Sequence, residues 1–217
     1  MMSLKFTGNF PPKLMALRED YSGNNMDYYK CNAKAFVEST LQVDMKPLYE
    51  KFLPLLPMQA GILDVGCGSG RDTKYFIEHG YNVTAFDASA EIVSLAEKEV
   101  GQMIDVQRVE DIQYKNQFDG IWACASLLHV SLNELPDVFY RLLLALKPNG
   151  VIYFSFKYGQ GEYEKEGRWF TDLDEASLLT LVDEVEGLAI KELWLTADRR
   201  VGRQHEQWLN GILVVSA

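Results

Sequence analysis

The segment ILDVGCGSGRDTKYFIEHG, residues 62–80, joins an expected strand to an expected helix through a loop that contains three glycines. The strand is residues 62–65, the loop GCGSG is residues 66–70, and a helical pattern begins at residue 71. Glycines let the backbone approach a ligand closely, and the helix N-terminus offers free N–H groups. A tight strand-to-helix turn that binds nothing gives the same pattern, so the loop alone leaves ligand binding open.

Short apolar runs typical of strands alternate with amphipathic runs typical of helices from residue 61 onward. The expected strands are residues 61–66, 82–86, 103–107, 118–124 and 151–157. After a helix near 174–185, the strands 188–196 and 206–216 follow with no helix between them, so they pair as an antiparallel hairpin. The polar stretches 111–117 and 157–168 are expected to be loops. The pattern predicts an α/β fold with a doubly wound, mainly parallel sheet.

The first part of the chain has a helical pattern instead. Apolar residues recur at helical spacing over 33–41 and again over 48–56, which predicts two helices before the first strand. We therefore divide the chain into an N-terminal helical cap segment, residues 1–58, and a sheet domain, residues 59–217, within one compact domain.

The composition of the chain excludes several classes of partner and location. The chain has 217 residues with 21 Lys and Arg against 31 Asp and Glu, a net charge of −10, so a nucleic-acid partner is not expected. No apolar run suits a membrane span or a signal peptide, and we expect a cytoplasmic protein that does not bind membranes. Three scattered cysteines and three scattered histidines predict buried free thiols and no metal site.

An acidic residue follows the second expected strand. Asp87 lies 21 residues after Gly66, where a doubly wound fold places a carboxylate that accepts both hydroxyls of a ribose. A dinucleotide fingerprint of the form GxGxxG would need glycine at position 71, where the sequence has Arg71. The combination favours a cofactor with one nucleoside over a dinucleotide.

Successive motifs resemble those of one enzyme family. LDVGCGSG (63–70), VTAFDAS (83–89), VEDI (109–112), FDGIWACASLLHV (118–130) and LKPNGVIYFSF (146–156) are similar to the motifs of class I S-adenosylmethionine-dependent methyltransferases. The resemblance covers roughly residues 60–217 and is strongest to small bacterial enzymes of the tellurite-resistance and ubiquinone-biosynthesis type. It implies a Rossmann-like sheet of seven strands in the order 3-2-1-4-5-7-6, with strand 7 antiparallel, and an N-terminal helical lid. It also implies S-adenosyl-L-methionine as cofactor and S-adenosyl-L-homocysteine as product.

The resemblance also implies the cofactor-binding residues. They are Asp64, Gly66, Cys67, Gly68, Gly70, Asp87, Ala88, Asp111, Ile112, Ala123, Ser126, Tyr28 and Tyr29. In this set Asp87 binds the ribose hydroxyls, Asp64 lies near the methionine amino group, and Asp111 accepts a hydrogen bond from the adenine amine. Residues 123–126 line the sulfonium, and Tyr28 and Tyr29 belong to the lid. Simple structural roles, such as a turn for Asp111, a loop cap for Asp64 and core packing for the tyrosines, remain open.

The substrate side is expected at the carboxyl ends of the later strands. Lys157 and Arg168 follow the fifth strand, and Arg199, Arg200 and Arg203 lie in the final hairpin. Arginine pairs well with carboxylate or phosphate, so this cluster indicates an anionic substrate, unless it is a solvated hairpin tip.

One histidine is a candidate catalytic residue. His129 follows the fourth strand, where the family resemblance implies a substrate-facing residue. A neutral imidazole there could accept a proton from the acceptor, but a packing role is equally compatible with the apolar neighbours of His129.

The leading hypothesis is therefore an enzyme that transfers a methyl group in line from S-adenosylmethionine to a small, anionic molecule. The protein is expected to be a monomer or a homodimer. The alternatives are a methyltransferase acting on a protein or a nucleic acid, and a non-catalytic module that binds S-adenosylmethionine and transfers nothing.

Overall fold

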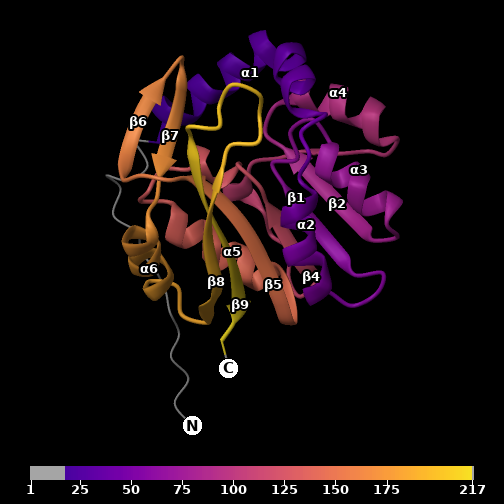
Figure 1. Ribbon diagram of the computed structural model, residues 1–217, viewed down its shortest axis with the longest axis vertical. Coiled ribbons are helices and arrows are strands. Elements are labelled where there is room, and N and C mark those ends of the chain that lie inside the picture. The colour runs from indigo at the N-terminus through magenta and orange to yellow at the C-terminus, as the bar shows by residue number, and fades with distance from the viewer. Residues whose placement is uncertain (1–17, 217) are drawn as a thin grey trace.

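Seven strands form the central sheet in the order β3-β2-β1-β4-β5-β9-β8 (Figure 1). The structure is a computed structural model that describes residues 18–216, with side chains from residue 27 onward; the first 17 residues of the expected cap segment lie outside it. The strands are Gly61–Val65 (β1), Asn82–Asp87 (β2), Asp105–Val106 (β3), Phe118–Ala123 (β4), Leu146–Lys157 (β5), Leu188–Ala197 (β8) and Gln207–Val215 (β9). β1 to β5 pair in parallel, and β9 pairs antiparallel with both β5 and β8. The expected order and hairpin are confirmed, with β9 as the antiparallel strand.

Helices cover both faces of this sheet. They are α1 (Arg18–Thr40), α2 (Lys46–Phe52), α3 (Arg71–Glu78), α4 (Ala90–Val100), α5 (Leu135–Ala145) and α6 (Glu175–Asp183), with short 3-10 turns at Leu53–Leu55, Val109–Asp111 and Leu127–His129. The two helices expected before the first strand are α1 and α2. Within residues 18–216, no helix is both long enough and apolar enough to span a membrane.

Side chains alternate between the two faces along each central strand. Ile121 and Ile152 join the larger core with α5 and α6, whereas Trp122 and Tyr153 pack with Phe52 of α2 on the opposite face. This alternation is the period of a β-strand, and it lets a sheet covered on both faces bury most residues of β4 and β5. The sheet is therefore a rigid platform whose strand ends position the loops.

α1 lies across the edge of the sheet at which the parallel strands end (Figure 1). It contacts α4 on one side and β7 on the other. The loop between β8 and β9 reaches the same edge of the molecule (Figure 1). The chain thus covers the carboxyl edge of its sheet, where ligands bind in this class of fold.

A second, smaller sheet replaces part of an expected loop. β6 (Gly161–Lys165) and β7 (Arg168–Asp172) form an antiparallel hairpin, although the polar stretch 157–168 predicted a loop. β6 is almost wholly exposed, so it lacks the apolar run that signals a strand. Glu166 and Gly167 both have positive φ, 55° and 72°, as a two-residue type I′ hairpin turn requires.

Three further expectations need correction. β5 begins at Leu146 and not at residue 151, because residues 147–150 bulge out between two pairs with β4. β3 has two residues in place of the expected 103–107, because only Asp105 and Val106 pair with β2. Cys31 is exposed on α1, so the expectation of buried thiols is wrong for that cysteine.

Close packing of α2 on the sheet gives a test of the fold. A Cβ atom at Gly120 of β4 would lie 2.7 Å from Cζ of Phe52 and 2.8 Å from Cδ2 of Leu56. We expect Gly120→Ala to lower the free energy of unfolding by about 1–3 kcal/mol through overpacking, measured by urea titration. Gly61→Ala is the matched control, because its nearest neighbour would be at 3.4 Å. Equal stability of the two variants would contradict the packing described.

Candidate functional site

Two adjoining cavities lie at the carboxyl edge of the sheet. The first, the Asp87 cavity, has a volume of about 150 Å³ and is lined by the glycine loop, the end of β2 and the segments 107–110 and 125–130. The second, the arginine cavity, has a volume of about 400 Å³ and extends to β7 and the β8–β9 loop. Both are lined by the residues that we call the junction: Tyr29, Phe36, Gly66, Gly68, Ala125 and His129.

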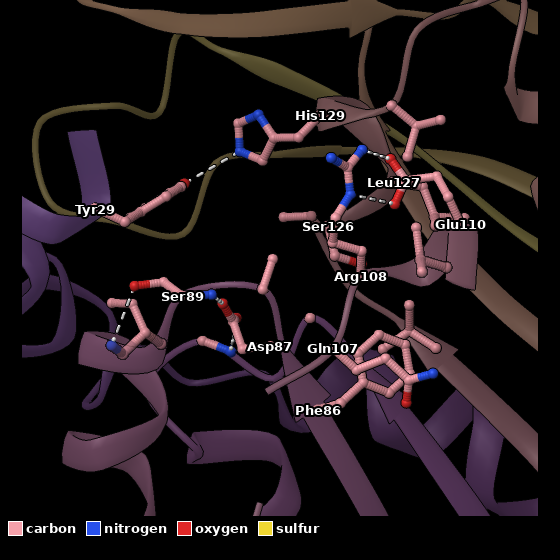
Figure 2. Close-up of a pocket in the computed structure, with 18 of the residues that line it drawn as sticks. Tyr29, Phe86, Asp87, Ser89, Gln107, Arg108, Glu110, Ser126, Leu127 and His129 are labelled. Atoms are coloured by element: carbon pink, nitrogen blue, oxygen red, sulfur yellow. Dashed lines mark hydrogen bonds and ion pairs between the residues drawn. The ribbon is translucent and has the colours of Figure 1, made fainter. Parts of the chain in front are cut away.

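Asp87 is the carboxylate of the smaller cavity. Its Oδ2 accepts a hydrogen bond from the backbone N–H of Gly68 and its Oδ1 accepts one from that of Ser89, each at 3.0 Å (Figure 2). Burial raises the pKa of Asp87, while the backbone donors act in the opposite direction. Because an ionised carboxylate has about four acceptor positions, both oxygens keep a lone pair for donors in the cavity.

The loop before α3 approaches the end of β4 closely. Gly66 has a φ of +66°, and a Cβ atom there would lie 2.6 Å from Cβ of Ser126. A side chain at this position would therefore be strained and would clash. The Ser126 hydroxyl is buried and has no hydrogen-bond partner among the described residues, although it lines the Asp87 cavity. Buried hydroxyls are normally paired, so this hydroxyl is available to a ligand.

The far wall of the Asp87 cavity comes from the segment after β3. Arg108 donates to both carboxylate oxygens of Glu110, at 2.7 and 3.3 Å (Figure 2). Sequence reasoning missed both residues and chose their neighbours. Asp111 is exposed and Ile112 is buried in the core, and neither lines either cavity. No sequence pattern distinguishes these adjacent positions, because the chain turns here as a short 3-10 helix.

The remaining expected cofactor residues divide into two groups. Gly66, Cys67, Gly68, Asp87, Ala88, Ser126 and Tyr29 each line at least one cavity. Asp64, Gly70, Ala123 and Tyr28 line neither. Asp64 is buried beneath the glycine loop and accepts a hydrogen bond from Thr73 Oγ at 2.5 Å, and burial raises its pKa. The structure thus gives Asp64 a position from which it supports the loop.

Tyr29 and His129 form a hydrogen-bonded pair at the junction. His129 Nδ1 lies 2.8 Å from the carbonyl oxygen of Trp169, so Nδ1 carries the proton and donates it. His129 Nε2 is then the acceptor for the Tyr29 hydroxyl at 3.1 Å (Figure 2). Burial lowers the pKa of His129 to about 4 and raises that of Tyr29 to about 12. Both side chains are therefore neutral near pH 7.

The arginine cavity gathers positive charge in an acidic protein. Its lining has seven basic side chains against four acidic ones: Arg71, Lys157, Lys165, Arg168, Arg199, Arg200 and Arg203 with Asp72, Glu166, Asp198 and Glu206. All five basic residues expected on the substrate side are among them. Within the described part of the chain, no cluster of His, Cys, Asp and Glu is arranged to hold a metal ion.

Arg71 connects the glycine loop to α1. It is the first residue of α3, it donates to Asp72 at 2.6 and 2.8 Å, and its Nη1 donates to the carbonyl oxygen of Thr40 at 3.2 Å. Thr40 is the last residue of α1. In the sequence, Arg71 served only to exclude a dinucleotide. Its contact with the end of α1 could not be predicted, because Thr40 lies 31 residues away in the chain.

Burial of His129 predicts a pH dependence of stability. Its ordinary pKa of 6.5 falls to about 4 on folding. As the pH falls, the unfolded chain therefore binds a proton at His129 before the folded chain does. The neutral imidazole contributes fully to the free energy of unfolding above pH 6.5, and this contribution is lost as the pH falls toward 4. Between pH 7 and 5 the wild type should lose about 2 kcal/mol of unfolding free energy that His129→Gln does not lose.

Urea unfolding at pH 7, 6 and 5 measures this difference. His79→Gln, which removes an exposed histidine at the end of α3, is the control and should keep the wild-type dependence. Identical pH slopes for the wild type and His129→Gln would contradict the buried, neutral imidazole.

Comparison with known proteins finds a family match over part of the chain. Residues 62–150 match the family model of a methyltransferase domain. The chain is 34% identical over 110 residues to a malonyl-[acyl-carrier protein] O-methyltransferase of Pectobacterium atrosepticum, covering 49% of this chain and 43% of that protein. It is 33% identical over 135 residues to a ubiquinone biosynthesis O-methyltransferase of Histophilus somni, covering 52% and 55%. The chain thus spans about half the length of the curated relatives it matches.

A solved structure extends the likeness over the whole fold. The 1,6-didemethyltoxoflavin-N1-methyltransferase of Burkholderia thailandensis superposes with a TM-score of 0.74 at 20% identity, over 99% of this chain and 94% of that one. That enzyme was solved with bound 1,6-didemethyltoxoflavin and S-adenosylhomocysteine. At this identity the likeness concerns the fold alone.

Proposed function

We propose that this chain, which carries a class I S-adenosylmethionine-dependent methyltransferase domain, transfers a methyl group from S-adenosylmethionine to a small, anionic molecule. The observation that supports this most is the pair of adjoining cavities. One is built around a carboxylate with free lone pairs, the other is lined by an excess of basic side chains, and the two meet at the junction. Relatives named as O-methyltransferases support the same reaction class.

The residues of the Asp87 cavity fit a nucleoside cofactor with a sulfonium. Asp87 presents hydrogen-bond acceptors to ribose hydroxyls. Gly66 has no side chain, so a ligand can approach its backbone closely, and Ser126 offers a hydroxyl without a partner among the described residues. Tyr29 and Phe36 supply aromatic rings at the junction, which suit a cation. When bound, the cofactor supplies an electrophilic methyl group. The chain aligns the acceptor with this methyl group, and α1 excludes water from the site.

His129 has limited capacity as a base. Burial lowers its pKa to about 4, and a base this weak gives little driving force for accepting a proton at pH 7. Its Nε2 also accepts the hydroxyl hydrogen of Tyr29. We therefore propose that His129 acts mainly by orienting Tyr29 at the junction, and that the acceptor needs no strong base.

Cofactor choice is the first test of this proposal. Calorimetry should detect binding of S-adenosylmethionine and S-adenosylhomocysteine and none of NAD, because Arg71 occupies the position of the last glycine in a dinucleotide loop. Incubation with tritium-labelled S-adenosylmethionine and metabolite extracts should then give a labelled small molecule. Binding without any labelled product would favour the non-catalytic module, and NAD binding without S-adenosylhomocysteine binding would contradict the proposal.

Asp87→Ala tests the ribose contact. We expect it to weaken S-adenosylhomocysteine binding by about 2–4 kcal/mol, since each hydrogen bond to a charged group contributes roughly 1.5–3 kcal/mol. Thermal unfolding checks that the variant stays folded. Asp105→Ala, which removes an exposed carboxylate from the neighbouring strand β3, is the matched control and should bind normally. Unchanged affinity in Asp87→Ala would remove Asp87 from the site.

A further inference from the structure

The five cations expected on the substrate side all have an acidic partner. Arg200 forms a two-pronged pair with the buried Asp198, and Arg199 donates to the side chain of Asp44 at 3.0 Å and to its backbone carbonyl. Two more cations share one acid: Lys157 lies 3.1 Å and Arg203 lies 3.8 Å from the carboxylate of Glu206. These acidic partners neutralise much of the positive charge that would attract an incoming anion.

Arg168 differs from the other four. Its side chain is 14% exposed, and its Nε is buried without a hydrogen-bond partner among the described residues. Its one ion pair joins Nη2 to Glu166 at 3.2 Å, and the Glu166 side chain is 63% exposed. An ion pair with so exposed a partner is weak. Arg168 therefore presents a buried guanidinium with a single weak ion pair, and a free Nε–H donor, in the wall of the arginine cavity.

Aromatic rings hold the Arg168 guanidinium in place. Its Cζ lies 4.1 Å from the ring centre of Tyr28 in α1 and 5.2 Å from that of Phe170 in β7. Lys157 Nζ lies 5.0 Å from the same Phe170 ring. A guanidinium stacked in this way is pre-organised, so less conformational entropy is lost when it binds an oxyanion.

This group also acts on the junction. The charges of Arg168 and Lys157 both lower the pKa of His129, and Arg168 lowers that of Tyr29, against the larger effect of burial. Phe170 connects the two groups directly: the centre of its ring lies 5.1 Å from that of the His129 ring, and Arg168 and Lys157 both pack against the same ring. An anion on Arg168 would thus lie close to the place where the two cavities meet.

The geometry points to Arg168, with Lys157 beside it, as the subsite that binds the anionic group of the acceptor. The ligand chemistry is an oxyanion, a carboxylate or a phosphate, carried close to the atom that is methylated. Arg199, Arg200 and Arg203 serve instead to hold the β8–β9 loop and the segment after α1. This assignment rests on the proposed function, because it places the subsite relative to the cofactor.

Calorimetric titration with simple oxyanions tests the subsite. Malonate, benzoate and phosphate are titrated separately, at constant ionic strength, into protein saturated with S-adenosylhomocysteine. We expect at least one of them to bind. Arg168→Gln should weaken that binding about ten- to a hundredfold with unchanged affinity for S-adenosylhomocysteine, since it removes a charged donor. Arg141→Gln in α5, which removes a paired arginine that lines neither cavity, is the matched control.

Two further variants keep the result decisive. Arg203→Gln should change oxyanion affinity by less than about twofold, because the Arg203 side chain is half-exposed and solvent and salt screen its charge. A large loss in Arg203→Gln with Arg168→Gln unaffected would overturn the assignment. Arg168→Lys keeps the charge but loses the planar fork, so it should bind more weakly than the parent. If Arg168→Gln does not fold, parental binding by Arg168→Lys would overturn the assignment.

The measurement order separates this inference from the proposed function. Failure of the wild type to bind S-adenosylhomocysteine would contradict the methyltransferase proposal itself. Binding of S-adenosylhomocysteine with no binding of any of the three oxyanions would overturn the subsite alone.

Discussion

A buried carboxylate, that of Asp72, joins the parts of the molecule on which the site depends. It accepts hydrogen bonds from the Tyr49 hydroxyl of α2 at 2.5 Å, from the indole of Trp122 in β4 at 2.8 Å, and from two nitrogens of Arg71. Burial alone would raise the pKa of Asp72, but the Arg71 charge and these hydrogen bonds hold it below its ordinary value. Removing one partner from a buried ion pair is strongly destabilising, so the four side chains act as one unit.

This unit links the glycine loop to the helix that covers it. Arg71 follows directly after the loop, and its Nη1 donates a hydrogen bond to the carbonyl group of Thr40, the last residue of α1. α1 in turn brings Tyr29 and Phe36 to the junction, where the Phe36 ring lies against Gly68. The position of the loop and that of the covering helix are therefore set by the same ion pair. Arg199 adds a second tie, through Asp44, just beyond the end of α1.

The sequence predicts those features that depend on local patterns. The alternation of strands and helices and the final hairpin follow from apolar periodicity, and the placement of Asp87 follows from its spacing after the glycine loop. The strand order comes instead from the resemblance of the motifs to those of class I methyltransferases. The β6–β7 hairpin was missed because an exposed strand needs no apolar run. The difference between Arg168 and Arg200 was missed for another reason: it depends on which carboxylate lies within reach. Asp198 is two residues from Arg200 and buried, whereas Glu166 turns toward solvent. Only the folded chain distinguishes them.

Burying the Arg168 guanidinium costs free energy, and the fold offsets this cost with aromatic rings and only one exposed acid, Glu166. A buried charge loses hydration, and full pairing, as in Arg200 with Asp198, would restore that energy but would leave nothing for a ligand. Stacking on Tyr28 and Phe170 compensates the guanidinium through ring faces and leaves the edge that carries Nε unpaired. Because one of these rings belongs to α1 and the other to β7, the stack exists only when α1 covers the sheet edge. The contact between α1 and β7 therefore also builds the anion subsite.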